Sequence, residues 1–337
     1  MRQRKGGLVL GAALLLAAAL LPFAVDTRYV ITQMTVFFIW ATVVTQWNLV
    51  FGVAGVFSLA QMALFAVGAY VTAMLGFYTH LSLWLAMPVA ALATVAVSML
   101  IGLACLRLRG PYVALLTLAI AQVMYVLIVT DTNCFTTADS GCMPLFGGVR
   151  GITRFGDLGF RSLFGGRWII ADYFVGLALL TLATLFTLVV IRSPLGLAFR
   201  ALRDNPDYAR ARGMSHFKYQ LWVFALSAFF TGLAGAFHAA HFKVVGPTIF
   251  ANSLLLFLLA MIVVGGIGRI WGPILGAVLL MLADEAFKEF SDYRNIGLGL
   301  IMALFVLALP EGLSGLIARV WRSLRTRQAP PPDMLSP

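Results

Sequence analysis

Residues 192–220 read RSPLGLAFRALRDNPDYARARGMSHFKYQ, a long polar interruption in an otherwise apolar chain. Apolar segments long enough to cross a bilayer flank it on both sides. Within the interruption, the pattern predicts two short helices joined by a tight break. This polar stretch therefore divides the chain into membrane segments before it and membrane segments after it.

The second of the two helices has clear start and stop signals. Asn205 stands at an N-cap position, Pro206 at the first helical position, and Asp207 in the first turn, where the helix dipole favours an acid. Gly213 follows the last turn, where a left-handed conformation is preferred. A helix from Pro206 to Arg212 has about two turns and is too short to be stable without a docking surface. That surface is either the chain's own membrane domain or a soluble partner, and the residues alone leave both open.

The composition is that of an integral membrane protein. Hydrophobic residues make up 61% of the 337 residues and charged residues only 11%, and the mean hydropathy is +0.95. A soluble domain of this size would have too little charge for its surface. We therefore predict an all-α polytopic integral membrane protein of about ten transmembrane helices, some of them broken or re-entrant. The predicted spans are residues 8–25, 30–50, 57–78, 83–105, 111–130, 169–191, 221–241, 251–267, 273–290 and 296–317.

The distribution of charge gives the orientation. With the N-terminus in the cytoplasm, the inner segments carry 16 of the 24 Lys and Arg residues and the outer segments carry 8. The excess of positive charge on one side follows the positive-inside rule and predicts an N-in/C-in topology. It also explains the net charge of +11 without a nucleic-acid partner. We expect one membrane domain over 1–320, with an outer loop at 131–168, a cytoplasmic loop at 192–220 and a basic, Pro-rich cytoplasmic tail at 321–337.

Two cysteines lie eight residues apart in the outer loop. On this topology, Cys134 and Cys142 face an oxidising compartment, where a disulfide forms readily. Two unpaired thiols are the alternative, and the spacing does not decide between them.

Two stretches rich in small and polar residues break the helical pattern, at 48–70 and at 264–276. Irregular backbone at membrane depth is tolerated only where protein buries it or where it lines a wet cavity. Small residues also let helices approach closely, so packing and pathway lining are both open. The candidate pathway residues are Asn48, Ser58, Gln61, Gly265, Gly266 and Gly268.

Motifs for catalysis and metal binding are missing. The chain has no phosphate-binding P-loop, no zinc-protease motif and no nucleophile elbow, so we predict no enzymatic activity, no cofactor and no metal. His238 and His241 are read as side chains at the membrane interface, since two histidines without a third ligand seldom bind a metal.

No acid or base lies in the middle of a predicted span; Asp284 and Glu285 come nearest, with Lys288 as a partner. Ion-coupled carriers usually hold such a group at depth, so its absence argues against self-powered transport and favours a pathway whose energy is delivered from elsewhere.

Six blocks of the sequence resemble the branched-chain amino acid ABC transporter permease family of the LivM type. They occur in the family's order and cover most of the chain from about 40 to 316. The blocks are residues 48–70, 107–122, 193–214, 224–236, 264–276 and 309–313.

The resemblance implies a subunit of a bacterial inner-membrane importer. It implies a second related permease, two cytoplasmic ATPases and a periplasmic solute-binding protein as partners, within the lipid bilayer. Arg203, Asp204, Asn205 and Gly213 match the family's motif for a short helix that docks in an ATPase cleft, and Arg200 and Pro206 belong to the same block.

Two departures from the family pattern leave the solute open. The outer loop is longer than the family's compact glycine motif, and Pro111 and Gln122 stand where related chains vary with substrate class. We expect ATP-driven import of a small amino-acid-like solute, a branched-chain amino acid first of all. The alternative is an ATP-independent channel for a small polar solute such as urea or an amide.

Overall fold

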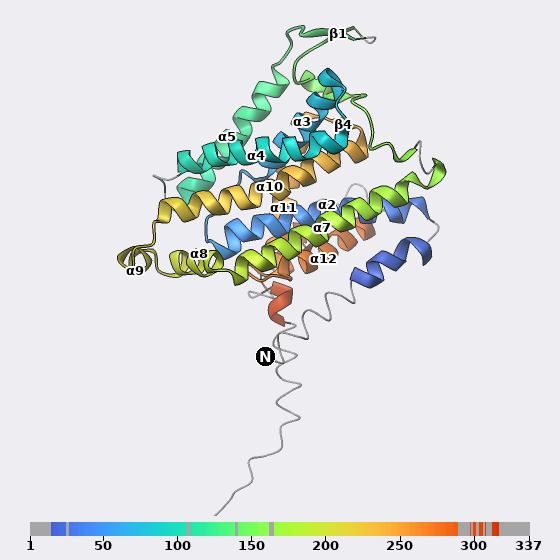
Figure 1. Ribbon diagram of the computed structural model, residues 1–337. Helices are drawn as coiled ribbons and strands as arrows, with labels where there is room; N and C mark the ends of the chain where they lie inside the picture. Colours follow the sequence, from blue (N-terminus) through green and yellow to red (C-terminus); the bar gives the residue numbers. More distant parts are fainter. Residues whose placement is uncertain are drawn as a thin grey trace, which may run out of the picture.

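A computed structural model shows a bundle of long helices (Figure 1). It describes residues 15–24, 27–105, 108, 110–138, 141–161, 165–288, 297, 299–300, 303–305, 307 and 312–316. Six of the described helical segments are long and apolar enough to cross a membrane. They are α2 with η1 (Arg28–Asn48 and Leu49–Val53), α3 (Gln61–Thr79), α4 (Leu83–Cys105), α5 (Pro111–Val129), α7 (Trp168–Arg192) and α10 (His216–Phe242).

Shorter helices complete the bundle. Leu15–Ala24 and α11 (Asn252–Gly265) are apolar but shorter than the six long spans. Helix α12 (Gly272–Phe287) has 16 residues. The chain is therefore a polytopic, all-helical membrane protein. Of the ten predicted spans, the first is described only from residue 15, and the last, at 296–317, lies largely outside the described residues, as does the tail at 321–337.

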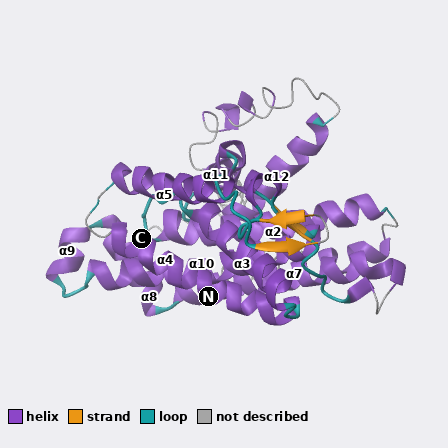
Figure 2. Cartoon of the chain, turned by 90° about the horizontal axis from the view of Figure 1, so that it is seen from above, coloured by secondary structure: helices purple, strands orange, loops and turns teal. Residues whose placement is uncertain are grey.

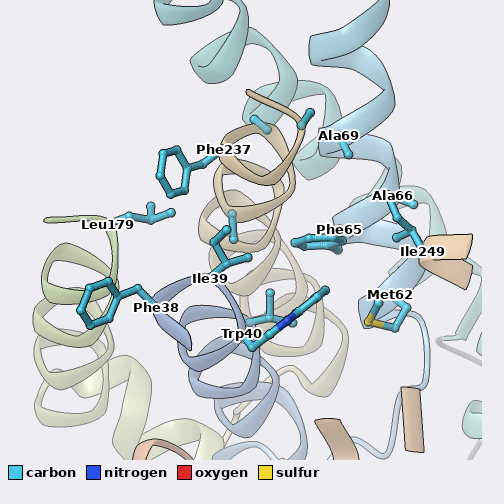
Figure 3. Close-up of a cluster of buried hydrophobic side chains, with 14 of the residues drawn as sticks. Phe38, Ile39, Trp40, Met62, Phe65, Ala66, Ala69, Leu179, Phe237 and Ile249 are labelled. Carbon is cyan, nitrogen blue, oxygen red and sulfur yellow. The ribbon is translucent and has the colours of Figure 1, made fainter. Parts of the chain in front are cut away.

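Two helices form the centre of the bundle. In α2 with η1 and in α10, 78% of the most apolar window is buried inside the protein, against 39% in α4 and 28% in α5. The largest cluster of buried side chains joins α2, α3, α7 and α10 (Figure 3). Aromatic rings dominate it: the ring centres of Trp40 and Phe65 lie 5.1 Å apart, and the ring of Phe38 packs edge-on against that of Tyr173.

Glycines allow the central helices to approach closely. A Cβ atom on Gly68 of α3 would overlap the backbone of Gly232 in α10, and one on Gly235 would overlap the backbone of Phe65. Gly232 in turn packs against Thr94 of α4. These glycines have ordinary helical backbones, so close packing explains them.

One end of the bundle carries two further helices, α8 (Pro194–Asp204) and α9 (Pro206–Ala211), at the left of Figures 1 and 2. We call this the hairpin end. The predicted pair of short helices is confirmed, and so is the break between them at Asn205.

The opposite end holds the loop 131–168 and two small antiparallel sheets. β1 (Thr136–Ala138) pairs with β2 (Gly141–Met143). A disulfide joins Cys134 to Cys142 across this pair of strands. β3 (Ile152–Thr153) pairs with β4 (Val244–Val245), which follows α10 directly. From β4 the chain continues through η4 (Pro247–Phe250) into α11.

An ion pair joins the same loop to the end of α10. Lys243 Nζ lies 2.9 Å from Asp157 Oδ2. The hydrogen bond from Lys243 is the main reason why the pKa of Asp157 lies below its ordinary value, and the amide of Gly159 also lowers it. The predicted pair of Lys288 with Glu285 is confirmed at 2.5 Å, and Tyr29 of α2 joins both side chains.

Candidate functional site

Helix α9 follows its sequence signals closely. Asn205 Oδ1 accepts a 3.1 Å hydrogen bond from the backbone N–H of Tyr208, which is the expected N-cap. Pro206 occupies the first turn and Gly213 has a φ of +83°. The helix ends at Ala211, with Arg212 as its C-cap, one residue before the predicted end.

The two helices of the hairpin differ in what supports them. Phe199 of α8 is buried in a cluster with Leu49 and Val223 of the long helical segments, and Leu202 of α8 is also buried. In contrast, Ala209 is the only buried residue of α9 among residues 203–213. The first helix therefore rests on the chain's own membrane domain, whereas the second buries only Ala209 against the part of the chain that the structure describes.

The exposed face of the hairpin combines apolar, aromatic and charged groups. Leu197 and Tyr208 are 66% and 59% exposed. Arg212 donates a 2.7 Å hydrogen bond to the Tyr208 hydroxyl, and its guanidinium lies 5.2 Å from the centre of that ring. Asp207 Oδ1 lies 3.6 Å from Arg210 Nη1. Such a face suits a complementary protein surface better than a lipid one, because its charges need water or partners.

Arg200 fastens the hairpin to the preceding helix. Its Nε donates to the carbonyl of Gly196 and its Nη2 to the carbonyl of Ile191, both at 3.2 Å. The second bond satisfies a carbonyl at the C-terminal end of α7, which has no partner inside the helix. Gly196 lies so close to the end of α7 that a Cβ atom there would overlap the Ile191 carbonyl. The connection between α7 and α8 is therefore tight.

Arg203 reaches from the hairpin into the membrane domain. Its Nη1 donates a 2.7 Å hydrogen bond to the carbonyl of Gly52 in η1, the π-helical turn that continues α2. Its Nε donates to Asp204 at 2.9 Å. Gly55, with a φ of +73°, leaves the space that the aliphatic part of Arg203 fills.

Asn48 links the same turn to the loop between α11 and α12. Its Oδ1 accepts a 2.8 Å hydrogen bond from the N–H of Gly268, and its Nδ2 donates at 3.0 Å to the carbonyl of Arg269. The backbones of Gly52 and Gly268 are in contact. The structure thus gathers Arg203, Gly52, Asn48 and Gly268 from three distant parts of the chain, and we call this group the hairpin junction.

The other predicted pathway residues are buried inside the protein. Gln61 donates to Thr231 of α10, and the carbonyl of Ser58 accepts a 2.8 Å hydrogen bond from Trp47. Gly265 packs against the backbone of Gly272, and Gly266 has a φ of +111°. These contacts favour the packing alternative for both broken stretches.

Sequence reasoning missed one buried pair. Asp172 of α7 and His241 of α10 lie 2.8 Å apart, Oδ2 to Nδ1, and both are buried. The interfacial reading of His241 is therefore wrong, and His238 lies among Trp40, Phe65 and Phe242. Within the part of the chain that the structure describes, no three His, Cys, Asp or Glu side chains are grouped to hold a metal ion.

The comparisons with known proteins agree with this architecture. The family described as "Branched-chain amino acid transport system / permease component" matches residues 29–309. No solved structure matches the chain.

Among curated proteins, the chain is similar to high-affinity branched-chain amino acid transport system permease proteins. It is 33% identical to LivM of Salmonella typhimurium over 314 residues, 89% of this chain and 73% of that protein. It is also 33% identical to LivM of Escherichia coli over 89% of this chain and 73% of that protein. LivH of Escherichia coli is 26% identical over 47% of this chain and 56% of its own length. The chain therefore belongs to the family of permease components of branched-chain amino acid transport systems.

Proposed function

We propose that this chain is one of two permease subunits of an ATP-driven importer for branched-chain amino acids. The partners are a second, related permease, two ATPase subunits and a periplasmic solute-binding protein. The chain lies in a bacterial inner membrane as a single permease domain, residues 1–320, with about ten spans and both termini in the cytoplasm. The hairpin end then faces the cytoplasm and the loop 131–168 faces the periplasm.

The observation that carries this proposal is the unequal support of the hairpin. Helix α8 is anchored on the membrane domain. In contrast, the residues from Arg203 to Gly213, which include all of α9, are exposed except Ala209. A two-turn helix gains stability from a second surface. An ATPase cleft supplies that surface from the side where ATP is hydrolysed.

The junction gives the hairpin a direct connection to the spans. Force applied to α9 reaches α8 through Asn205 and reaches η1 through the Arg203–Gly52 hydrogen bond. Asn48 extends this connection to the loop before α12. Closure of the ATPases would therefore move the ends of α2, α11 and α12 together. On this proposal, Asn48, Gly265, Gly266 and Gly268 move with the pathway rather than lining it.

The experiment is uptake by reconstituted vesicles. Vesicles holding both permeases and the ATPases, with the binding protein outside and ATP inside, should accumulate labelled leucine. Vesicles holding this chain alone should not. Flux through this chain alone without ATP would show that the chain works as a channel and not as a subunit of an ATP-driven importer.

A variant of α9 tests docking separately from folding. Tyr208→Ala removes an exposed ring whose described contact is with Arg212 of the same helix. We expect the permeases to assemble normally but to bind the ATPases about tenfold more weakly, the effect of losing a central aromatic contact. Leu185→Ala, at an exposed position of α7, is the matched control. Equal ATPase binding by both variants would remove the docking role of α9.

A further inference from the structure

Helix α5 is the least buried of the six long helices, with 28% of its apolar window covered by the rest of the chain. Its exposed stripe includes Leu115, Val123 and Val126. The stripe carries no charge, and lipid tails would cover most of it without cost. A side-chain amide interrupts it.

That group is the side-chain amide of Gln122. Gln122 lies near the middle of the 19 residues of α5, about 17 Å from the first residue at ~1.5 Å per residue. Its Nε2 donates a 3.1 Å hydrogen bond to Oδ1 of Asn252, the first residue of α11. Gln122 is half-buried and Asn252 is exposed. The two amides therefore meet at membrane depth on the outside of this subunit.

The pair leaves much of its hydrogen-bonding capacity unused. Two amides offer four N–H donors and two oxygen acceptors, and one hydrogen bond joins them. In the described part of the chain, neither side-chain amide has another partner. Hydrocarbon cannot supply partners, and unsatisfied polar groups there are costly. Water, a polar ligand or a polar group of a partner subunit supplies these partners.

The buried amides of Asn48 and Gln61, two of the predicted pathway residues, behave differently. Both side-chain atoms of Asn48 are bonded to backbone, and Gln61 is bonded to Thr231. Those residues have little left to offer a solute. Gln122 and Asn252 have free donors and acceptors, and the exposed Ser253 lies next to Asn252.

We propose that the exposed face of α5, centred on Gln122 and Asn252, lines the solute pathway against the second permease. This inference rests on the proposed function and names the surface that the transported amino acid touches. The amide N–H groups donate to its carboxylate and the amide oxygens accept from its ammonium group. Leu115, Val123 and Val126 contact its aliphatic side chain. Neutral groups hold a zwitterion weakly enough to release it.

The test is the reactivity of single cysteines toward a charged, water-soluble methanethiosulfonate in the assembled transporter. The background is Cys105→Ala, with the Cys134–Cys142 bond intact. Gln122→Cys and Asn252→Cys are compared with Leu182→Cys, which is 58% exposed near the middle of α7. Because the reagent needs a hydrated thiolate, the first two should react at least about tenfold faster than the control. Turnover with leucine-loaded binding protein should slow them.

Two results would overturn the inference. Reaction at Gln122→Cys as slow as at Leu182→Cys would place the face in lipid or in dry contact with the partner. Fast reaction that leucine does not slow would show that the surface is hydrated but does not line the solute pathway. The labelling rate without leucine needs no ATP, so this part of the test is independent of the proposed function. If uptake proceeds without the ATPases, the importer reading fails while the labelling result stands.

Discussion

Arg203 Nη1 lies 2.7 Å from the carbonyl oxygen of Gly52, across 151 residues of sequence. This hydrogen bond joins the hairpin to the π-helical turn that ends the first long span. A carbonyl in such a turn has lost its regular helical partner, and the guanidinium supplies one. The same guanidinium pairs with Asp204. Arg203 therefore ties the hairpin to this turn, in addition to the contacts that Arg200 and Phe199 make with the membrane domain.

Arg203→Glu should uncouple ATP hydrolysis from transport. The carboxylate would repel both the Gly52 carbonyl and Asp204, so motion of the hairpin would no longer reach the spans. We expect leucine uptake to fall by about tenfold or more, the size expected when a charged hydrogen bond is lost. ATP hydrolysis should continue but no longer respond to the loaded binding protein. Both rates are measured in vesicles, with Arg150→Glu, the same charge change at an exposed arginine of the loop 131–168, as the control; wild-type uptake by Arg203→Glu would contradict the coupling role.

Gly55→Ala should destabilise the protein more than Gly213→Ala. Both glycines have positive φ, +73° and +83°, so each alanine costs about 1–2 kcal/mol of backbone strain. A Cβ atom at Gly55 would also meet the side chain of Arg203, whereas nothing lies within 4 Å at Gly213. Thermal unfolding in detergent should show the larger loss for Gly55→Ala, with uptake reduced as well. Equal losses would show that the Arg203 contact adds nothing.

The Asp157–Lys243 pair should make stability depend on acid pH. The pKa of Asp157 is lowered in the folded protein, chiefly by the hydrogen bond from Lys243. A lowered carboxyl pKa stabilises the fold above the ordinary value of about 3.9, and this contribution disappears as pH falls through the folded value. Wild type should therefore have a higher Tm than Asp157→Asn at pH 6. The difference should shrink as pH falls below about 3.9 and should disappear only once the pH lies below the folded pKa of Asp157. A difference that persists there would exclude the ion pair as its cause.

The disulfide and the buried thiol should respond differently to alkylation. Without reductant, a maleimide should label none of the three cysteines of the native protein, since Cys134 and Cys142 are bonded and Cys105 is buried. Reductant should release two sites in the folded protein, and denaturation should add the third. Mass spectrometry counts the labels. Two labels on native, unreduced protein would show that Cys134 and Cys142 are free thiols.

Much of the fold could be predicted from the sequence because its signals are local. Long apolar runs predicted the helices, and the boundaries at Pro111 and Thr79 fall within a residue of those expected. The N-cap at Asn205 and the left-handed Gly213 depend on a few neighbouring residues. Such features need no knowledge of the rest of the chain.

The contacts that organise the site could not be predicted in the same way. Gly52 and Arg203, or Asp172 and His241, are far apart in the sequence and share no motif. The π-helical turn at Leu49–Val53 has no simple residue signature, although the glycines at 52 and 55 marked an irregular stretch. Whether Gln61 faced a pathway or a neighbouring helix depended on Thr231, 170 residues away. Periodicity reports how residues face along one helix, but not which distant side chain lies opposite.

At the end opposite the hairpin, the pairing of Ile152 with Val245 joins the loop 131–168 to the segment that leads back into the membrane. From Val245 the chain runs directly through η4 to Asn252, the residue bonded to Gln122. A protein that pressed on the loop 131–168 would therefore displace the amide pair without first moving a long helix. The two faces of the membrane would then act on different parts of the same subunit: one shifts the span ends at Gly52, and the other adjusts the groups that meet the solute.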